Sequence, residues 1–202
     1  MTRRAASQLQ TRRRITESAI ALHGTLGPSR TSMSAVAEHA GVRRSTLYRH
    51  FPDEAALFDA CSAHWNALNP PPDAAAWAAV EAPDERLSIA LAELYDFYRR
   101  TATMLENLLR DEQLPLVRAR FGAFREYLGV AEHVLMAGRR SRGTARRRVR
   151  AAIGHALTFS TWRSLTVEQE LDAARAIALM RALVDAAGAP VAPAKRARRD
   201  RA

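Results

Sequence analysis

The sequence is poor in several residue types, and each shortage narrows what the protein can be. Cys61 is the only cysteine, so an internal disulfide is excluded and nothing points to an oxidising compartment. No stretch approaches the roughly 20 apolar residues that a membrane-spanning helix needs. The basic N-terminus is not followed by the apolar core of a signal peptide. We therefore expect a cytoplasmic protein that does not enter a membrane.

Aromatic residues make up only 6% of the chain and β-branched residues are sparse, whereas alanine and arginine are abundant. Alanine and arginine favour helices, so the composition predicts an all-α protein. With 202 residues and 48% hydrophobic content, the chain can bury a substantial core. Its length suits one domain or two small ones.

Acidic residues are too few to balance the basic ones, and the excess positive charge lies at the two ends. The formal net charge is +10, and Lys195 is the only lysine. Residues 1–54 carry nine arginines and four acids, and residues 195–202 carry five basic residues and one acid; the other 140 residues carry 17 arginines and 16 acids. A basic end on a nearly neutral body is typical of nucleic-acid binding. The alternative is a protein whose basic termini are merely solvated.

The first 70 residues are expected to form four helices after a flexible basic arm at residues 1–7. Apolar residues recur at helical spacing in about 8–26, 33–40, 44–50 and 54–68. Ser32 and Asp53 are good N-caps for the second and fourth of these helices. Gly41 ends the second helix and can adopt the positive φ that a tight turn needs.

The remaining chain is also expected to be helical. After a loop at 69–83 with a short helical piece around Trp77, the pattern predicts helices at about 83–100, 103–110, 114–137 and 144–165. A last helix is expected to start at Thr166, because Thr166-Val-Glu-Gln169 matches a capping box, and to end at Gly188. Residues 190–202 are expected to be a disordered basic tail. No segment predicts a strand.

Residues 31–52 predict a helix-turn-helix. Leu47 and Phe51, four residues apart, can face the preceding helix. That orientation leaves an outward surface with basic, hydroxyl and aromatic groups, which suits the major groove of DNA. This surface comprises Arg44, Ser45, Tyr48 and Arg49.

At this point the sequence resembles the TetR family of bacterial regulators. The resemblance spans roughly 27 residues, and in the rest of the chain it is limited to size, helix order and a similar final pair of helices. The residues that carry it are Thr31-Ser32-Met33, Ala37, Ala40-Gly41-Val42, Thr46-Leu47-Tyr48, His50-Phe51 and Leu57.

The resemblance implies roles for single residues. Thr46, Tyr48 and His50 would contact phosphates or lie beside them. Arg44 and Ser45 would lie nearest the bases, with Tyr48 reaching a base or a thymine methyl group. The complete set of candidate DNA contacts is Ser32, Arg43, Arg44, Ser45, Thr46, Tyr48, Arg49 and His50.

Three positions depart from the family's pattern. Arg43 stands where a capping Ser or Thr is common, so the recognition helix either lacks this cap or gains a phosphate contact. Ser45 stands where Gly is common. Glu54 stands where a basic phosphate contact is common; it suits the helix dipole but repels DNA.

The resemblance also implies the organisation of the chain. An N-terminal three-helix DNA-binding domain would occupy residues 1–52, and a C-terminal helical ligand-binding and dimerisation domain would occupy residues 53–189, before the tail at 190–202. The last two helices, within about 144–187, would form the interface of a homodimer. A dimer doubles the bases read and matches a palindromic double-stranded DNA operator.

A small-molecule effector would bind among the central helices if the resemblance extends that far. Apolar side chains at helical spacing fit a ligand pocket and a plain core equally well. The candidate ligand contacts are Trp65, Tyr98, Phe121, Phe124, His155 and Phe159.

The main hypothesis is therefore a ligand-responsive repressor, and the alternative is a weakly specific architectural DNA-binding protein without an effector. An enzyme is not expected, because the sequence has neither a glycine-rich phosphate loop nor a nucleophile with a convincing base. Neither a cofactor nor a metal is expected, since Cys61 and His64 lack two further ligands nearby. The Arg139–Arg150 cluster has three readings: a solvated loop, a second DNA contact or an anionic-ligand site.

Overall fold

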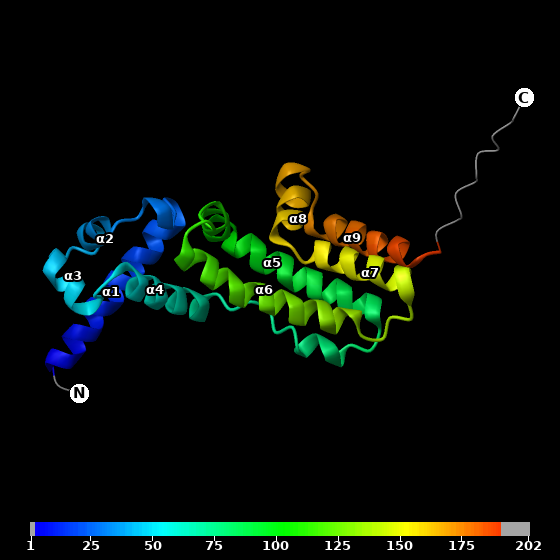
Figure 1. Ribbon diagram of the computed structural model, residues 1–202, viewed down its shortest axis with the longest axis horizontal. Helices are drawn as coiled ribbons and strands as arrows, with labels where there is room; N and C mark the ends of the chain where they lie inside the picture. The colour runs from blue at the N-terminus through cyan, green and yellow to red at the C-terminus, as the bar shows by residue number, and fades with distance from the viewer. Residues whose placement is uncertain (1–2, 191–202) are drawn as a thin grey trace, which may run out of the picture. The chain divides into compact units, whose positions relative to one another are not determined.

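The protein is described by a computed structural model over residues 3–190, and every regular element in that range is helical (Figure 1). The all-α prediction is confirmed. No helix within residues 3–190 combines the length and apolar character needed to span a membrane. The chain divides into two compact units. The first comprises residues up to Ala74 together with Glu93–Val130, and the second comprises Ala75–Ala92 and the residues from Ala131 onward.

The first unit contains the N-terminal helices and one part each of two longer helices. Its elements are α1 (Arg3–Thr25), η1 (Pro28–Arg30), α2 (Met33–His39), α3 (Arg44–His50) and α4 (Glu54–Leu68), with the adjoining parts of α5 (Pro83–Arg110) and α6 (Pro115–Met136). Helix α1 packs against α2 and α4, and α2 packs against α3. The core of this unit comprises Ile15, Ala19, Val36, Ala37, Leu47, Phe51, Leu57, Phe58, Val117 and Phe121, with their neighbours.

Helix α1 begins earlier than the sequence predicts. The expected flexible arm at 1–7 is wrong for the residues that the structure describes, because α1 is helical from Arg3. Arginine and alanine at the start of α1 are good helix formers, and the Thr11 hydroxyl donates back to the Ser7 carbonyl at 2.9 Å. The basic residues of this segment therefore lie on a helix.

The second unit contains the C-terminal helices. Its elements are η2 (Ala76–Ala79), α7 (Gly143–Ala156), α8 (Phe159–Arg163), η3 (Ser164–Glu168) and α9 (Ala173–Gly188), with the other parts of α5 and α6. Helices α7 and α9 lie side by side (Figure 1). Its buried side chains include Trp77, Leu87, Leu91, Leu135, Met136, Val149, Ile153, Leu157, Met180 and Val184.

One predicted helix break is absent. The expected division into helices at 83–100 and 103–110 is wrong, since α5 is continuous from Pro83 to Arg110. Thr101, a poor helix former at the expected break, is buried, and its hydroxyl donates to the Phe97 carbonyl at 2.6 Å. This bond satisfies the hydroxyl inside the helix, so the chain does not need to leave it.

The predicted helix at 144–165 is interrupted. Helix α7 ends at Ala156, and Thr158 then caps α8, with its hydroxyl accepting from the Thr161 amide at 3.2 Å. A threonine side chain that bonds a nearby backbone amide competes with helical hydrogen bonding. The apolar pattern alone does not show this break.

The last helix starts at Ala173, so the predicted start at Thr166 is wrong. The Thr166 hydroxyl donates to the Trp162 carbonyl at 2.9 Å and therefore belongs to the preceding turn. The cap of α9 is instead Asp172, whose carboxylate accepts from the Arg175 amide at 2.8 Å. Glu170, at φ 54°, reverses the chain between the two elements.

Other sequence predictions are confirmed by the helix bounds. The predicted helix at 114–137 is α6, and the short piece around Trp77 is η2. Asp53 caps α4, with its carboxylate accepting from the Ala56 amide at 2.8 Å. The expected tail at 190–202 lies, apart from residue 190, outside the described residues.

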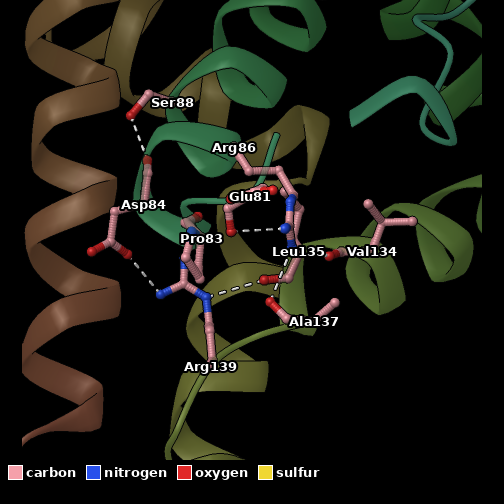
Figure 2. Close-up of polar contacts among 9 residues, drawn as sticks. All are labelled: Glu81, Pro83, Asp84, Arg86, Ser88, Val134, Leu135, Ala137 and Arg139. Atoms are coloured by element: carbon pink, nitrogen blue, oxygen red, sulfur yellow. Dashed lines mark hydrogen bonds and ion pairs between the residues drawn. The ribbon is translucent and has the colours of Figure 1, made fainter. Parts of the chain in front are cut away.

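A buried arginine, Arg86, joins helices of the second unit, and the hydrophobic pattern of the sequence does not predict this role. The Arg86 side chain, in the first turn of α5, is 5% exposed. Its guanidinium donates to the carbonyl oxygens of Glu81 (3.2 Å), Val134 (3.0 Å) and Ala137 (3.0 Å), as Figure 2 shows. It also donates to the Val80 carbonyl at 2.7 Å. The Val134 and Ala137 carbonyls lie at the end of α6, where helical carbonyls lack amide partners. Arg86 therefore caps α6 from the start of α5.

Arg139 has a similar structural role, which resolves part of the arginine cluster. It donates to the Leu135 and Pro83 carbonyls and pairs with Asp84 at 2.9 Å (Figure 2). Arg148 likewise donates to the Ala187 and Ala189 carbonyls at the end of α9, and Arg150 pairs with Glu132. Arg139 and Arg148 thus bind carbonyls at helix ends, so the solvated-loop reading does not apply to them, whereas Arg150 is exposed and makes a surface ion pair.

We expect Arg86→Ala to lower the free energy of unfolding by about 3 kcal/mol or more, because it leaves buried carbonyls unsatisfied. Urea denaturation measures the change. The matched control is Arg99→Ala on the same helix, which breaks an exposed pair with Asp96 and is expected to cost at most about 1 kcal/mol. Equal losses in the two variants would contradict the role given to Arg86.

Candidate nucleic-acid interface and effector cavity

Helices α2 and α3 form the helix-turn-helix. The Ser32 hydroxyl accepts a hydrogen bond from the Ala35 amide at 3.1 Å and so caps α2. Gly41 follows the helix with φ 61°, a left-handed conformation that costs glycine nothing sterically. The turn therefore leads the chain directly into α3.

Helix α3 has one buried and one exposed face. Leu47 and Phe51 are fully buried, in agreement with the structural role expected of both. Tyr48 is 42% exposed, although a tyrosine ring gains free energy by burial. The other residues exposed on this face are Arg44, Ser45 and Arg49. The candidate base contacts thus share one accessible surface.

The remaining candidate DNA contacts lie at helix ends or beside the exposed face. Arg43 occupies the N-cap position of α3, is exposed and makes no capping side-chain bond. Thr46 and His50 are half-buried. Burial, followed by the charges of Arg49 and Arg12, lowers the pKa of His50. The lowered pKa favours the neutral form of the ring.

Arg12 connects α1 to the end of α3, a contact that the sequence does not reveal. Its guanidinium donates to the His50 carbonyl at 2.8 Å and lies 4.2 Å from the centre of the Phe51 ring. Arginine is suited to both contacts, since it stacks on aromatic faces and neutralises helix C-terminal carbonyls. Arg12 thus attaches α1 to the C-terminal end of α3.

A cavity of about 240 Å³ lies within the first unit. Its walls come from α1, α4, α5 and α6, and most of the lining side chains are apolar. They include Ile20 and His23 from α1, Phe58 and Trp65 from α4, Phe97 and Leu105 from α5, and Phe121, Phe124 and Tyr127 from α6. The cavity is therefore bounded by the same α1 and α4 that pack around the helix-turn-helix.

The six candidate ligand contacts separate into three groups. Trp65, Phe121 and Phe124 line the cavity. Tyr98 does not line it but is fully buried behind it, with its ring centre 6.4 Å from that of Phe124. The other two candidates belong to the second unit: His155 is exposed, and Phe159 is buried with its ring 5.2 Å from Trp162.

His23 lies in the cavity wall beside Cys61. The ring Nδ1 is 3.6 Å from the Cys61 sulfur, and the ring centre is 5.5 Å from that of Phe58. Burial lowers the pKa of His23 to about 4, against an opposing charge effect from Asp111. Burial also raises the pKa of the Cys61 thiol to about 11. At pH 7 this part of the wall is consequently uncharged.

The C-terminal end of α5 holds the last turn of α1 and the loop that follows it. The Asn107 amide donates to the His23 and Gly24 carbonyls at 3.1 and 2.7 Å. The Asp111 carboxylate accepts from the Ser29 amide and hydroxyl at 2.9 and 2.8 Å. Burial favours a raised pKa for Asp111, but the bonds from Ser29 and the neighbouring Arg110 outweigh it and lower the pKa. We call Asn107, Arg110 and Asp111 the loop clamp.

Gly27 lies inside the loop clamp. It has φ 92°, and a Cβ atom there would lie 2.7 Å from the Asp111 carboxylate. Both the backbone conformation and the lack of space require glycine. Beside it, Arg110 donates to the Leu26 carbonyl at 2.8 Å. The loop clamp is thus hydrogen-bonded directly to the backbone of the loop.

The described residues 3–190 contain no group of three or more His, Cys, Asp or Glu side chains placed to hold a metal ion. His64, the second residue of the C-x-x-H pair, instead lies 3.9 Å from the Glu17 carboxylate.

Residues 15–61 match the family model described as bacterial regulatory proteins, tetR family. This segment runs from α1 into α4 and includes the whole helix-turn-helix. No curated protein matches the chain by sequence. The match agrees with the resemblance that the sequence motif itself carries.

Solved structures share the fold over most of the chain. A TetR-like transcriptional regulator from Rhodococcus sp. RHA1 is 20% identical, with a TM-score of 0.62 over 86% of this chain and 93% of that chain. FadR from Bacillus subtilis, solved with stearoyl-CoA, is 17% identical, with a TM-score of 0.57 over 88% and 98%. NalD, the secondary repressor of the MexAB-OprM multidrug efflux pump in Pseudomonas aeruginosa, is 21% identical, with a TM-score of 0.55 over 86% and 95%.

We expect the burial of His23 to make stability depend on pH. Its folded-state pKa of about 4 lies below the ordinary value of 6.5, so below pH 6.5 the unfolded chain binds a proton that the folded chain does not. The free energy of unfolding should therefore fall by roughly 2–3 kcal/mol as the pH drops from 7 to 4.

Urea denaturation at pH 7, 5.5 and 4.5 measures this component as the difference between the wild-type chain and His23→Gln. The variant should lose less stability on acidification. His133→Gln replaces an exposed histidine and serves as the control that keeps the wild-type dependence. Identical pH dependence in wild type and His23→Gln would contradict the assignment.

Proposed function

We propose that this chain, which carries the DNA-binding domain of the tetR family of bacterial regulators, is a ligand-responsive repressor that binds a palindromic operator as a homodimer. The observation that carries the proposal is the exposed basic and hydroxyl-bearing face of α3, together with an apolar cavity in the same unit whose walls include α1 and α4. Two proteins of similar fold support the ligand-responsive part: FadR was solved with stearoyl-CoA, and NalD represses a multidrug efflux pump.

In this proposal α3 enters the major groove of the operator. Arg44 and Ser45, in its first turn, lie nearest the base edges, and an arginine there can pair with the O6 and N7 atoms of a guanine. Tyr48, one turn later, reaches a further base or a thymine methyl group. The phosphate contacts are Ser32, Arg43, Thr46, Arg49 and His50.

The homodimer is proposed to form through α7 and α9. Leu179 and Leu183, four residues apart on α9, are 47% and 40% exposed, and exposed leucines on one helix face favour association. A two-fold axis brings the same face of a second copy against them. Ala152 and Ala156 of α7 are buried within the single chain, so they do not supply surface to this interface.

Release from the operator is proposed to follow from the shared walls of the cavity. Ile20 and His23 belong to α1, and Phe58 and Trp65 belong to α4. A ligand that binds more tightly when these helices are displaced shifts the population toward that arrangement. The loop clamp couples the displacement to the loop that precedes α2. The spacing of the two recognition helices in the dimer then no longer fits both half-sites.

We expect specific binding to depend on Arg44 and Tyr48. The test is a fluorescence-anisotropy titration against DNA upstream of the chain's own coding sequence and against a scrambled control, at two salt concentrations. A preference of about 10³-fold that survives the higher salt supports a specific regulator. Arg44→Ala and Tyr48→Ala should each reduce that preference about tenfold to hundredfold.

The control variant for this titration is Arg99→Ala, which removes one exposed positive charge from α5 and should leave the preference unchanged. Equal binding to both DNAs with a steep salt dependence would favour a weakly specific architectural protein. A selection of genomic fragments then shows whether any operator is preferred, and its failure would overturn the proposal.

We expect Leu183→Glu to dissociate the dimer, since it places a charge in the proposed apolar interface. Sedimentation velocity should show a dimer for the wild type and a shift of at least tenfold toward monomer for the variant. Leu68→Glu changes another exposed leucine, on α4, and should leave the dimer intact. A monomeric wild type, or a variant that stays dimeric, would contradict the interface.

A further inference from the structure

We propose that the effector is a small, uncharged aromatic molecule with a hydrogen-bond acceptor that receives the hydroxyl proton of Tyr127. This inference rests on the proposed function, and it narrows the chemical class of the ligand. It follows from the volume of the cavity, the rings in its wall, its charges and one unpartnered hydroxyl group.

The volume sets the size of the ligand. The cavity measures about 240 Å³, whereas sites for drug-sized ligands occupy roughly 300–1,000 Å³ and an apolar cavity of about 150 Å³ can hold one benzene molecule. A molecule of one substituted ring or two fused rings therefore fits. A long acyl chain with a nucleotide head group would extend beyond this volume.

The wall favours a flat, apolar ligand. The ring of Phe124 stacks on that of Tyr127, with centres 5.7 Å apart and an interplanar angle of 21°. Phe97 lies on the other side of this pair, 6.2 Å from Phe124. Trp65 and Phe121 add further aromatic surface. Aromatic rings pack well against another ring, by stacking or by edge-to-face contact.

The charges of the wall disfavour an ion. Arg120 is the only side chain with a permanent charge among the lining residues; it is exposed and pairs with Asp59 outside the cavity. None of the lining residues is a carboxylate that could neutralise a cation. His23, deeper in the wall, is uncharged because burial holds its pKa at about 4. Transferring an unpaired charge from water into such a site costs much free energy.

The Tyr127 hydroxyl supplies the polar anchor. Tyr127 lines the cavity, and its hydroxyl oxygen is buried without a hydrogen-bond partner among the residues that the structure describes. A buried hydroxyl without a partner costs about 1–3 kcal/mol, which a bound acceptor recovers in part. Burial, followed by the charges of Glu93 and Asp73, raises the pKa of this hydroxyl. It therefore keeps its proton and acts as a donor.

The experiment compares probes of equal size on the full-length chain by isothermal titration calorimetry at pH 8. Naphthalene has no acceptor, quinoline has one neutral ring nitrogen, N-methylquinolinium carries a positive charge, and 2-naphthoate carries a negative charge. We expect quinoline to bind about tenfold more tightly than naphthalene, and both ions to bind more weakly than quinoline.

Tyr127→Phe tests the anchor. It should reduce the ratio of quinoline to naphthalene affinity to about one while changing naphthalene affinity by no more than about twofold. Tyr95→Phe is the matched control, because Tyr95 is a buried tyrosine of the same unit that does not line the cavity, and it should keep the ratio. An unchanged ratio in Tyr127→Phe, tighter binding of either ion, or no binding of any probe overturns the proposed ligand class.

Operator binding separates this inference from the proposed function. Quinoline that binds the chain but leaves operator affinity unchanged supports the ligand class and overturns ligand-responsive repression. Operator release by N-methylquinolinium, 2-naphthoate or stearoyl-CoA, but not by quinoline, overturns the ligand class and supports the repressor. Release by quinoline in the wild type, weakened about tenfold in Tyr127→Phe, supports both.

Discussion

Helix α1 packs into the core beneath α2 and α3 and also forms part of the cavity wall. The organisation of the first unit depends on this double role. Ile15 and Ala19 are completely buried in the core that supports α2 and α3. Ile20, the next residue, and His23, one turn after Ala19, form part of the cavity wall. The core beneath α2 and α3 and the cavity wall therefore share a single structural element.

The loop clamp strengthens this link at the place where α1 ends. An isolated loop such as residues 26–32 would be free to change conformation when α1 moves. Arg110 and Asp111 restrict it, since their bonds to Leu26 and Ser29 attach the loop backbone to the end of α5, while Asn107 holds the last turn of α1. The attached loop therefore has few conformations available to it. Under the proposed function, a ligand can act only by binding one of these conformations more tightly than another.

The local features of the fold could be predicted from the sequence because their causes are local. The Ser32 cap and the positive φ of Gly41 depend on residues within four positions. The predicted start of the last helix is wrong because Thr166 and Asp172 both suit an N-cap, and the local sequence pattern does not decide between them. Arg86 was missed for a different reason: two of its carbonyl partners lie about 50 residues away in the chain.

Some parts of the candidate site could be predicted from the sequence, and others could not. The exposed face of α3 followed from helical periodicity, since only one face can pack on the core. Apolar stripes could not separate cavity from core, so Trp65 and Phe124 line the cavity whereas Tyr98 is buried behind it. Arginines were the least predictable residues. Arg12 and Arg139 bind carbonyl oxygens, and nothing in their sequence neighbourhood distinguishes them from arginines left in solvent.

Gly27 has a consequence for how the chain can evolve. Substitutions on the exposed face of α3 would not disturb the core, and under the proposed function they would change the operator that is bound. Position 27 has no such freedom, because any side chain meets both the left-handed backbone and the Asp111 carboxylate. Under the proposed function, relatives that bind other operators and other ligands are therefore expected to keep glycine at this position. The residues that would set DNA specificity and the residue that fixes the loop thus lie at separate places in the sequence.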